Sequence, residues 1–125
     1  MNLPEEDESF LVRKGYEWTL SDASDGGLLV VKSYRVNGAR YDRDKTDLLL
    51  RIPAQYNMAR LDMWWVEPHL RLKNGGSYPE AANTLENYLG KAWQRFSRHL
   101  PDGVWRAGVD GLPMFLTFIN RELQG

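Results

Sequence analysis

The chain has 125 residues, 42% of them hydrophobic and 26% charged, so it suits one globular domain and is too short for two. Its net charge of -1 excludes a global positive field that would attract nucleic acid or an anionic membrane. No apolar run approaches the roughly 18 residues that cross a bilayer, and the acidic start is not a signal peptide, so the cytoplasm is the expected compartment. Cysteine is absent, which excludes disulfides, thiolate metal sites and a cysteine nucleophile.

The first 15 residues predict a short helix. Pro4 suits a first turn, and the acids that follow it complement the positive end of the helix dipole. Gly15 is a typical stop signal. Phe10 and Leu11 would form a small inner face.

Four strands are expected next, as an antiparallel meander. Residues 16–20 alternate in polarity, and the turn sequence SDASDGG joins them to the β-branched segment 28–36, as in a hairpin. Residues 46–53, TDLLLRIP, are nearly continuous in apolar side chains, which indicates burial on both faces. Residues 61–68, LDMWWVEP, alternate again, and a proline ends each of these last two strands.

The rest of the chain predicts a long loop and a closing helix. Residues 69–90 are polar and rich in Gly and Asn, and long ordered loops in compact domains are often functional. Residues 112–123 carry apolar side chains at helical spacing, with Pro113 in the first turn. The expected fold is α+β, one domain over residues 1–125. It has an N-terminal helix, a four-stranded antiparallel meander sheet, a long irregular active-site segment and a C-terminal helix.

Several local sequences resemble the ubiquitin-conjugating enzyme family. LLLRIPAQYN followed by MWWVEP is similar to the family's third and fourth strands, and Glu67-Pro68-His69 stands where the family has His-Pro-Asn. Trp105 precedes the closing helix as a tryptophan does in the family, and Ser97, eight residues back, stands where the family has its catalytic cysteine. The stretches WQRFSRH and GVDG are similar to a prokaryotic branch of the superfamily, of which this chain looks like a cysteine-less member.

The resemblance implies a conjugating enzyme of a bacterial ubiquitination-like pathway. It would carry the modifier's C-terminus as a serine oxyester and transfer it to an amine on a target protein. No cofactor is implied, because the activating enzyme consumes the ATP. The implied partners are a ubiquitin-like modifier, an adenylating activating enzyme, a target protein and an associated peptidase, with no nucleic acid, membrane or metal ion.

Ser97 is the predicted nucleophile, and it needs a base because a serine hydroxyl is barely ionised at neutral pH. His99 lies two residues on, which places both side chains on one side of an extended backbone. An imidazole suits proton transfer near neutrality, and His69 is the second candidate base. Asp110 would orient either imidazole or cap the closing helix. A competing register, counted forward from the Glu-Pro-His stretch, makes Ser77 the nucleophile instead.

The surrounding side chains would shape the site or bind the modifier; they are Trp93, Arg95, Arg98 and Trp105. Two departures from the family bear on function. A thioester is impossible without cysteine, and the asparagine that the family uses around the oxyanion is missing. The alternative is therefore a catalytically inactive conjugating-enzyme-like module that binds a ubiquitin-like protein or its activating enzyme.

Overall fold

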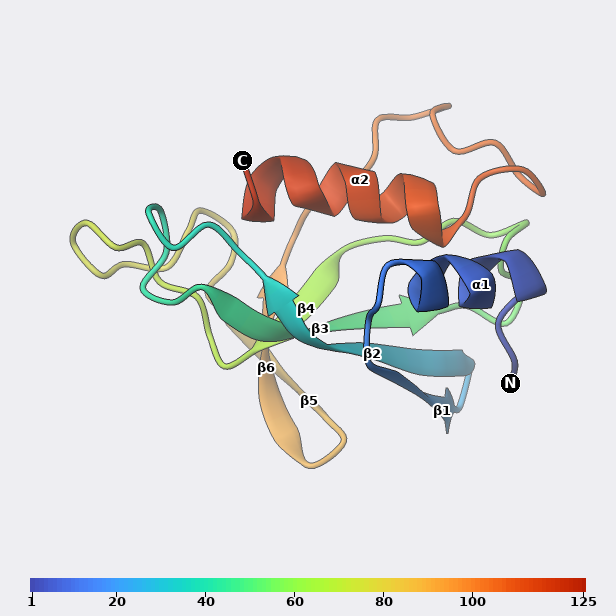
Figure 1. The fold of residues 1–125 in the computed structure, drawn as a ribbon, viewed down its shortest axis with the longest axis horizontal. Coiled ribbons are helices and arrows are strands. Elements are labelled where there is room, and N and C mark those ends of the chain that lie inside the picture. Colours follow the sequence, from blue (N-terminus) through green and yellow to red (C-terminus); the bar gives the residue numbers. More distant parts are fainter.

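A computed structural model describes all 125 residues, and its elements form one six-stranded antiparallel sheet with two helices. Both helices lie on the same face of the sheet (Figure 1). The strand order across the sheet is β1-β2-β3-β4-β6-β5. The elements are α1 (Glu5–Arg13), β1 (Trp18–Ala23), β2 (Gly26–Arg35), β3 (Lys45–Ile52), β4 (Trp64–Glu67), β5 (Thr84–Tyr88), β6 (Lys91–Phe96) and α2 (Leu112–Leu123).

The main core fills the space between the helices and the sheet. The apolar residues of α2 recur at helical spacing and are buried, and Leu11 of α1 joins them. From the sheet, alternate residues such as Leu29, Leu48 and Trp64 point to this side and are at most 1% exposed. Burial of these side chains is the main favourable contribution to folding.

The other face of the sheet, called here the outer face, carries a second apolar cluster made of Leu28, Val30, Leu49, Trp65 and Trp93. Longer side chains cover it. The guanidinium of Arg51 lies 4.5 Å from the ring centre of Trp65, and the ring of Tyr88 meets the same indole edge-on at 5.6 Å. β3 is therefore buried on both faces, as its continuous apolar sequence predicts.

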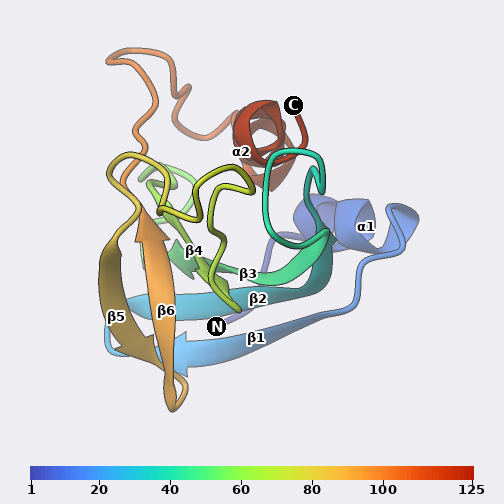
Figure 2. The same cartoon turned by 90° about the vertical axis from the view of Figure 1, so that its left-hand side faces the viewer.

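The predicted four-stranded sheet is wrong, because the sheet has six strands. The two additional strands, β5 and β6, form a hairpin at the edge of the sheet, steeply inclined to β1 and β2 (Figure 2). β5 falls within residues 69–90, which were expected to be irregular. Leu89 and Gly90 make the hairpin turn with φ of 53° and 77°.

The other predicted elements are confirmed in outline. Both helices and the hairpin of β1 and β2 are present, and prolines follow β3 and β4. β4 is shorter than expected, since it begins at Trp64 and the residues just before it lie in a loop. β6 pairs with β4, so the chain after β6 leaves the sheet beside the start of β4.

Candidate active site

Ser97 is the first residue after β6. Trp93 of β6 belongs to the outer cluster, so by strand alternation Arg95 and Ser97 lie on the outer side as well. The Ser97 side chain is partly exposed, and its Oγ accepts a hydrogen bond from Arg95 Nε at 3.1 Å. Its backbone N–H donates to the carbonyl of Ala81. The hydroxyl thus has a cationic donor, and no histidine is hydrogen-bonded to it.

His99 is paired with the carboxylate of Asp62, which the sequence did not predict as its partner in catalysis. Its Nδ1 lies 2.8 Å from Oδ1 of Asp62, and the backbone N–H of Met63 donates to the carbonyl of Arg98. With Nδ1–H donating to the carboxylate, Nε2 is the acceptor, and it has no protein partner. Because the His99 side chain is 56% exposed, Nε2 is open to an incoming proton donor. This is the arrangement in which an imidazole works as a general base.

His69 lies elsewhere. Its Nδ1 is 3.2 Å from the hydroxyl of Tyr78, and its Nε2 is 3.2 Å from the carbonyl of Ala92. Ala92 and Ser97 lie near opposite ends of β6, about 16 Å apart at the usual rise of roughly 3.3 Å per residue. The structure does not bring the second candidate base to Ser97.

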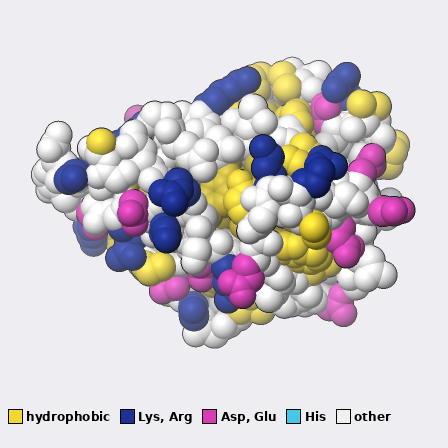
Figure 3. All heavy atoms as spheres, viewed as in Figure 1, with side chains coloured by type: hydrophobic (Ala, Val, Ile, Leu, Met, Phe, Trp, Pro, Cys, Tyr) yellow, Lys and Arg dark blue, Asp and Glu magenta, His cyan; other side chains and the backbone are white.

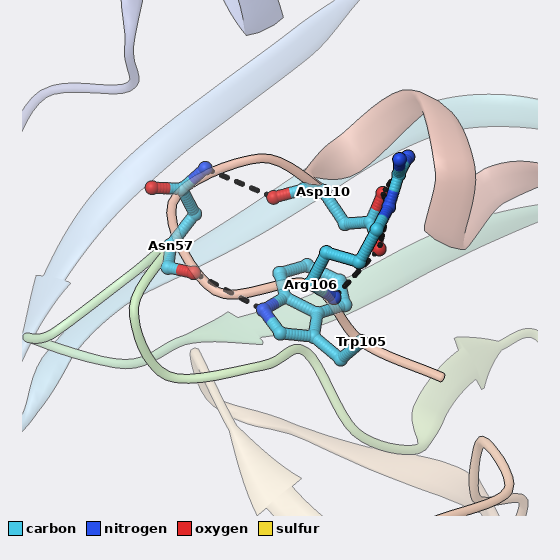
Figure 4. Close-up of polar contacts among 4 residues, drawn as sticks. All are labelled: Asn57, Trp105, Arg106 and Asp110. Atoms are coloured by element: carbon cyan, nitrogen blue, oxygen red, sulfur yellow. Dashed lines mark hydrogen bonds and ion pairs between the residues drawn. The ribbon is translucent and has the colours of Figure 1, made fainter. Parts of the chain in front are cut away.

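Asp110 pairs with an arginine and with no imidazole. Its carboxylate accepts Arg106 Nη2 at 2.8 Å and the Arg106 backbone N–H at 2.7 Å, and the first of these partners, the guanidinium, lowers the pKa of Asp110. The Asp110 carbonyl accepts Asn57 Nδ2, while the Asn57 carbonyl accepts Trp105 Nε1 (Figure 4). These four residues close the segment before α2 against the loop between β3 and β4.

Two further anchors fix the segment 97–111. Arg98 binds Glu122 of α2 through two hydrogen bonds, at 2.6 and 2.8 Å, in the bidentate geometry of arginine and carboxylate. At the other end, the Tyr56 hydroxyl donates to Asp7 of α1 and accepts the Leu112 N–H at 2.7 Å. Ser97 and His99 therefore stand on backbone that is held at both ends.

A hollow of about 530 Å³ opens on the outer face beside the His99–Asp62 pair. Asp62 forms part of its wall, and so do Arg60, Arg51 and Tyr88. Arg51 Nη1 donates to the Tyr88 hydroxyl, and Arg60 Nη1 reaches the carbonyl of Leu100. The turn between β1 and β2 adds a second carboxylate, so donors and acceptors are balanced in the wall.

The remaining predicted residues serve packing, with one exception. Trp93 is 3% exposed, and its indole N–H donates to the Tyr88 carbonyl. Trp105 donates to the Asn57 carbonyl, and the guanidinium of Arg98 is bound to Glu122 of α2. The exception is Arg95, which contacts Ser97 Oγ. Ser77, the alternative nucleophile, is exposed on the loop before β5, where its hydroxyl makes no hydrogen bond within the protein.

Sequence reasoning gave no catalytic or modifier-binding role to Asp62, Arg51 and Arg60. The available signal was charge inside apolar surroundings: Arg51 interrupts the run LLLRIP, while Arg60 and Asp62 flank a leucine just before β4. The contact of Asp62 with His99 also depends on the pairing of β4 with β6, which the sequence pattern did not reveal.

An antiparallel sheet with both helices on one face is compatible with the fold of E2 proteins, the conjugating class of ubiquitin-like pathways. The family described as prokaryotic E2 family E matches residues 3–125, and the chain belongs to that family. No curated protein and no solved structure matches the chain. Neither helix is long and apolar enough to cross a membrane.

Proposed function

We propose that this protein carries the C-terminus of a ubiquitin-like modifier as an oxyester on Ser97 and transfers it to an amine of a target. Membership of a prokaryotic E2 family supports a conjugating role, and the absence of cysteine excludes a thioester on this chain. The observation that carries the proposal is the His99–Asp62 pair, which presents an open Nε2 two residues beyond a partly exposed hydroxyl.

In the first step, Ser97 Oγ attacks the carbonyl carbon of the modifier's C-terminal adenylate. The Oγ proton passes to His99 Nε2, the new O–C bond forms, and AMP leaves with the electron pair of the broken bond. Asp62 holds the imidazole in the correct tautomer and stabilises the imidazolium. The proposal requires Nε2 to reach Oγ when the modifier is bound, since such bonds are often long in unliganded enzymes.

In the second step, an amine of the target attacks the ester carbon, His99 accepts the amine proton, and Ser97 leaves reprotonated. An oxyester is less reactive towards amines than a thioester, so donors at the tetrahedral oxyanion matter more. We assign this role to Arg95 Nε, which already donates a hydrogen bond to Ser97 Oγ. One such donor is typically worth about 3 kcal/mol.

We assign the modifier's C-terminal tail to the hollow beside Asp62. Its wall offers guanidinium donors from Arg51 and Arg60 and carboxylate acceptors from Asp25 and Asp62. Because these charges balance, the wall suits an extended main chain, whose carbonyl and N–H groups alternate, better than a strongly charged group.

The test mixes the protein with a modifier, its activating enzyme and ATP, and seeks a covalent adduct by intact mass. The natural chain is expected to form an adduct that hydroxide cleaves, Ser97→Ala none, and the matched control Ser77→Ala the normal amount. His99→Gln should slow adduct formation by about 100-fold or more. In a Ser97→Cys background the same histidine change should have much less effect, because a thiol ionises without a base. An adduct that persists in Ser97→Ala would disprove the assignment.

A second candidate function is a non-catalytic module that holds the modifier or the activating enzyme. The observation that favours it is the Ser97 hydroxyl itself, which accepts a bond from Arg95 and touches no imidazole. In that case the natural chain binds the modifier without forming an adduct, and Ser97→Ala binds equally well.

A further inference from the structure

Two neighbouring segments, residues 35–45 and 71–77, form a strongly basic surface at the end of the molecule opposite α1. It carries six cations and two carboxylates, a local charge of +4 on a chain whose net charge is -1, so the remainder carries -5. The cations are Arg35, Arg40, Arg43, Lys45, Arg71 and Lys73. Figure 3 shows dark blue side chains gathered at its left end, where Figure 1 places these loops.

The basic surface is built on paired backbone. The Asp42 N–H donates to the Arg71 carbonyl at 3.0 Å, and the Lys73 N–H donates to the Arg40 carbonyl at 2.8 Å. Between these bonds Tyr41 is fully buried, which turns its neighbours in the chain outwards. The six cations therefore form an array on two segments whose backbones are hydrogen-bonded to each other.

We expect the array to lower the stability of the folded protein, because its like charges repel one another. None of the six cations takes part in an ion pair, although six other pairs occur in the protein. Arg35 and Lys45 lie directly opposite each other across β2 and β3, and like charges in that position are destabilising. An unpaired and mutually repelling array is typical of a surface that meets an anionic partner.

We propose that the basic surface docks an acidic face of a partner protein. Two observations favour a protein over a nucleic acid. Asp42 and Asp44 lie among the cations, where they would repel a continuous phosphate backbone. The nearby aromatic rings cannot stack on bases, because Tyr41 is buried and the guanidinium of Arg71 covers Tyr78 at 4.1 Å. This inference does not depend on the chemistry of Ser97.

The test compares two triple variants that remove equal charge. Arg40→Gln with Arg43→Gln and Lys73→Gln neutralises the basic surface, while Arg13→Gln with Lys14→Gln and Arg121→Gln removes exposed cations elsewhere. The probes are a labelled polyglutamate peptide and a labelled DNA duplex of equal charge, followed by fluorescence anisotropy at low and physiological salt. The melting temperature of each variant checks folding, and neither is expected to melt much below the natural chain, because the removed cations make no ion pairs.

The first variant is expected to bind polyglutamate about tenfold more weakly than the natural chain, and the second about as well as it. Equal losses in both variants would show that the array is not a site. Failure of the natural chain to bind polyglutamate would also overturn the proposal, and tighter binding of the DNA duplex would replace the acidic protein with a nucleic acid.

Discussion

The hydroxyl of Tyr56 joins three parts of the chain, and its removal tests how the segment before α2 is held. It donates to Asp7 in α1 and accepts the Leu112 N–H at the start of α2. Tyr56→Phe keeps the ring but removes the hydroxyl donor of the buried Asp7 carboxylate and the hydroxyl acceptor of the Leu112 N–H. A hydrogen bond to a charged group contributes about 1.5–3 kcal/mol and a neutral one about 0.5–1.5, so the free energy of unfolding should fall by about 2–4.5 kcal/mol.

Urea denaturation at pH 7 measures the loss, with an unchanged m value as the sign that only stability has altered. Tyr88→Phe is the matched control, because its hydroxyl contacts only an exposed arginine, and it should cost less than about 1 kcal/mol. The loss in Tyr56→Phe should shrink in acid, because a protonated Asp7 no longer needs a donor. A loss no larger than that of the control, or one independent of pH, would refute the shared hydroxyl.

Burial raises the pKa of Asp7, so its contribution to stability is present below the unfolded value near 3.8 and is lost as the pH rises through the folded pKa. The free energy of unfolding of Asp7→Asn should therefore rise relative to that of the natural chain as the pH increases from acid to neutral. Urea denaturation at several pH values measures this difference. Arg98→Gln should lower the free energy of unfolding by about 1–3 kcal/mol, and a double-mutant cycle with Glu122→Gln should show coupling. The pKa of Asp110 is lowered, so its contribution is present above the unfolded pKa and is lost as the pH falls through the folded one. When the melting temperature is measured against pH, that of Asp110→Asn should fall less steeply towards acid than that of the natural chain.

Elements with one clear periodicity could be predicted from the sequence. α2 falls within the bounds that its apolar spacing gives, and the continuous apolar run of β3 correctly indicated burial on both faces. β5 could not be found in this way, because an edge strand exposes most of its side chains. Leu85 is 46% exposed, and one of the two less exposed positions of the strand is Glu86, so the segment shows no apolar alternation to detect.

In the candidate site, too, local sequence features could be predicted and contacts between distant segments could not. Ser97 was predicted from its spacing to Trp105 in the family resemblance, and His99 from its place two residues on. The contact of His99 with Asp62, in contrast, spans 37 residues and depends on β4 lying beside β6. Asp110 was expected to orient an imidazole or to cap α2, but Arg106 lies four residues away in the same turn and binds its carboxylate. A local partner of opposite charge therefore outcompeted a distant one.

A hydroxyl nucleophile depends on neighbouring groups for its reactivity more than a thiol does. A cysteine is partly ionised near neutrality and can react with little help, whereas a serine needs a base and a donor at the same moment. In the proposed mechanism the base comes from the His99–Asp62 pair, two residues beyond Ser97, and the donor from Arg95, which is hydrogen-bonded to Oγ. An inert scaffold gains nothing from a carboxylate that orients an exposed imidazole, so the pair is the feature that most favours catalysis over binding alone.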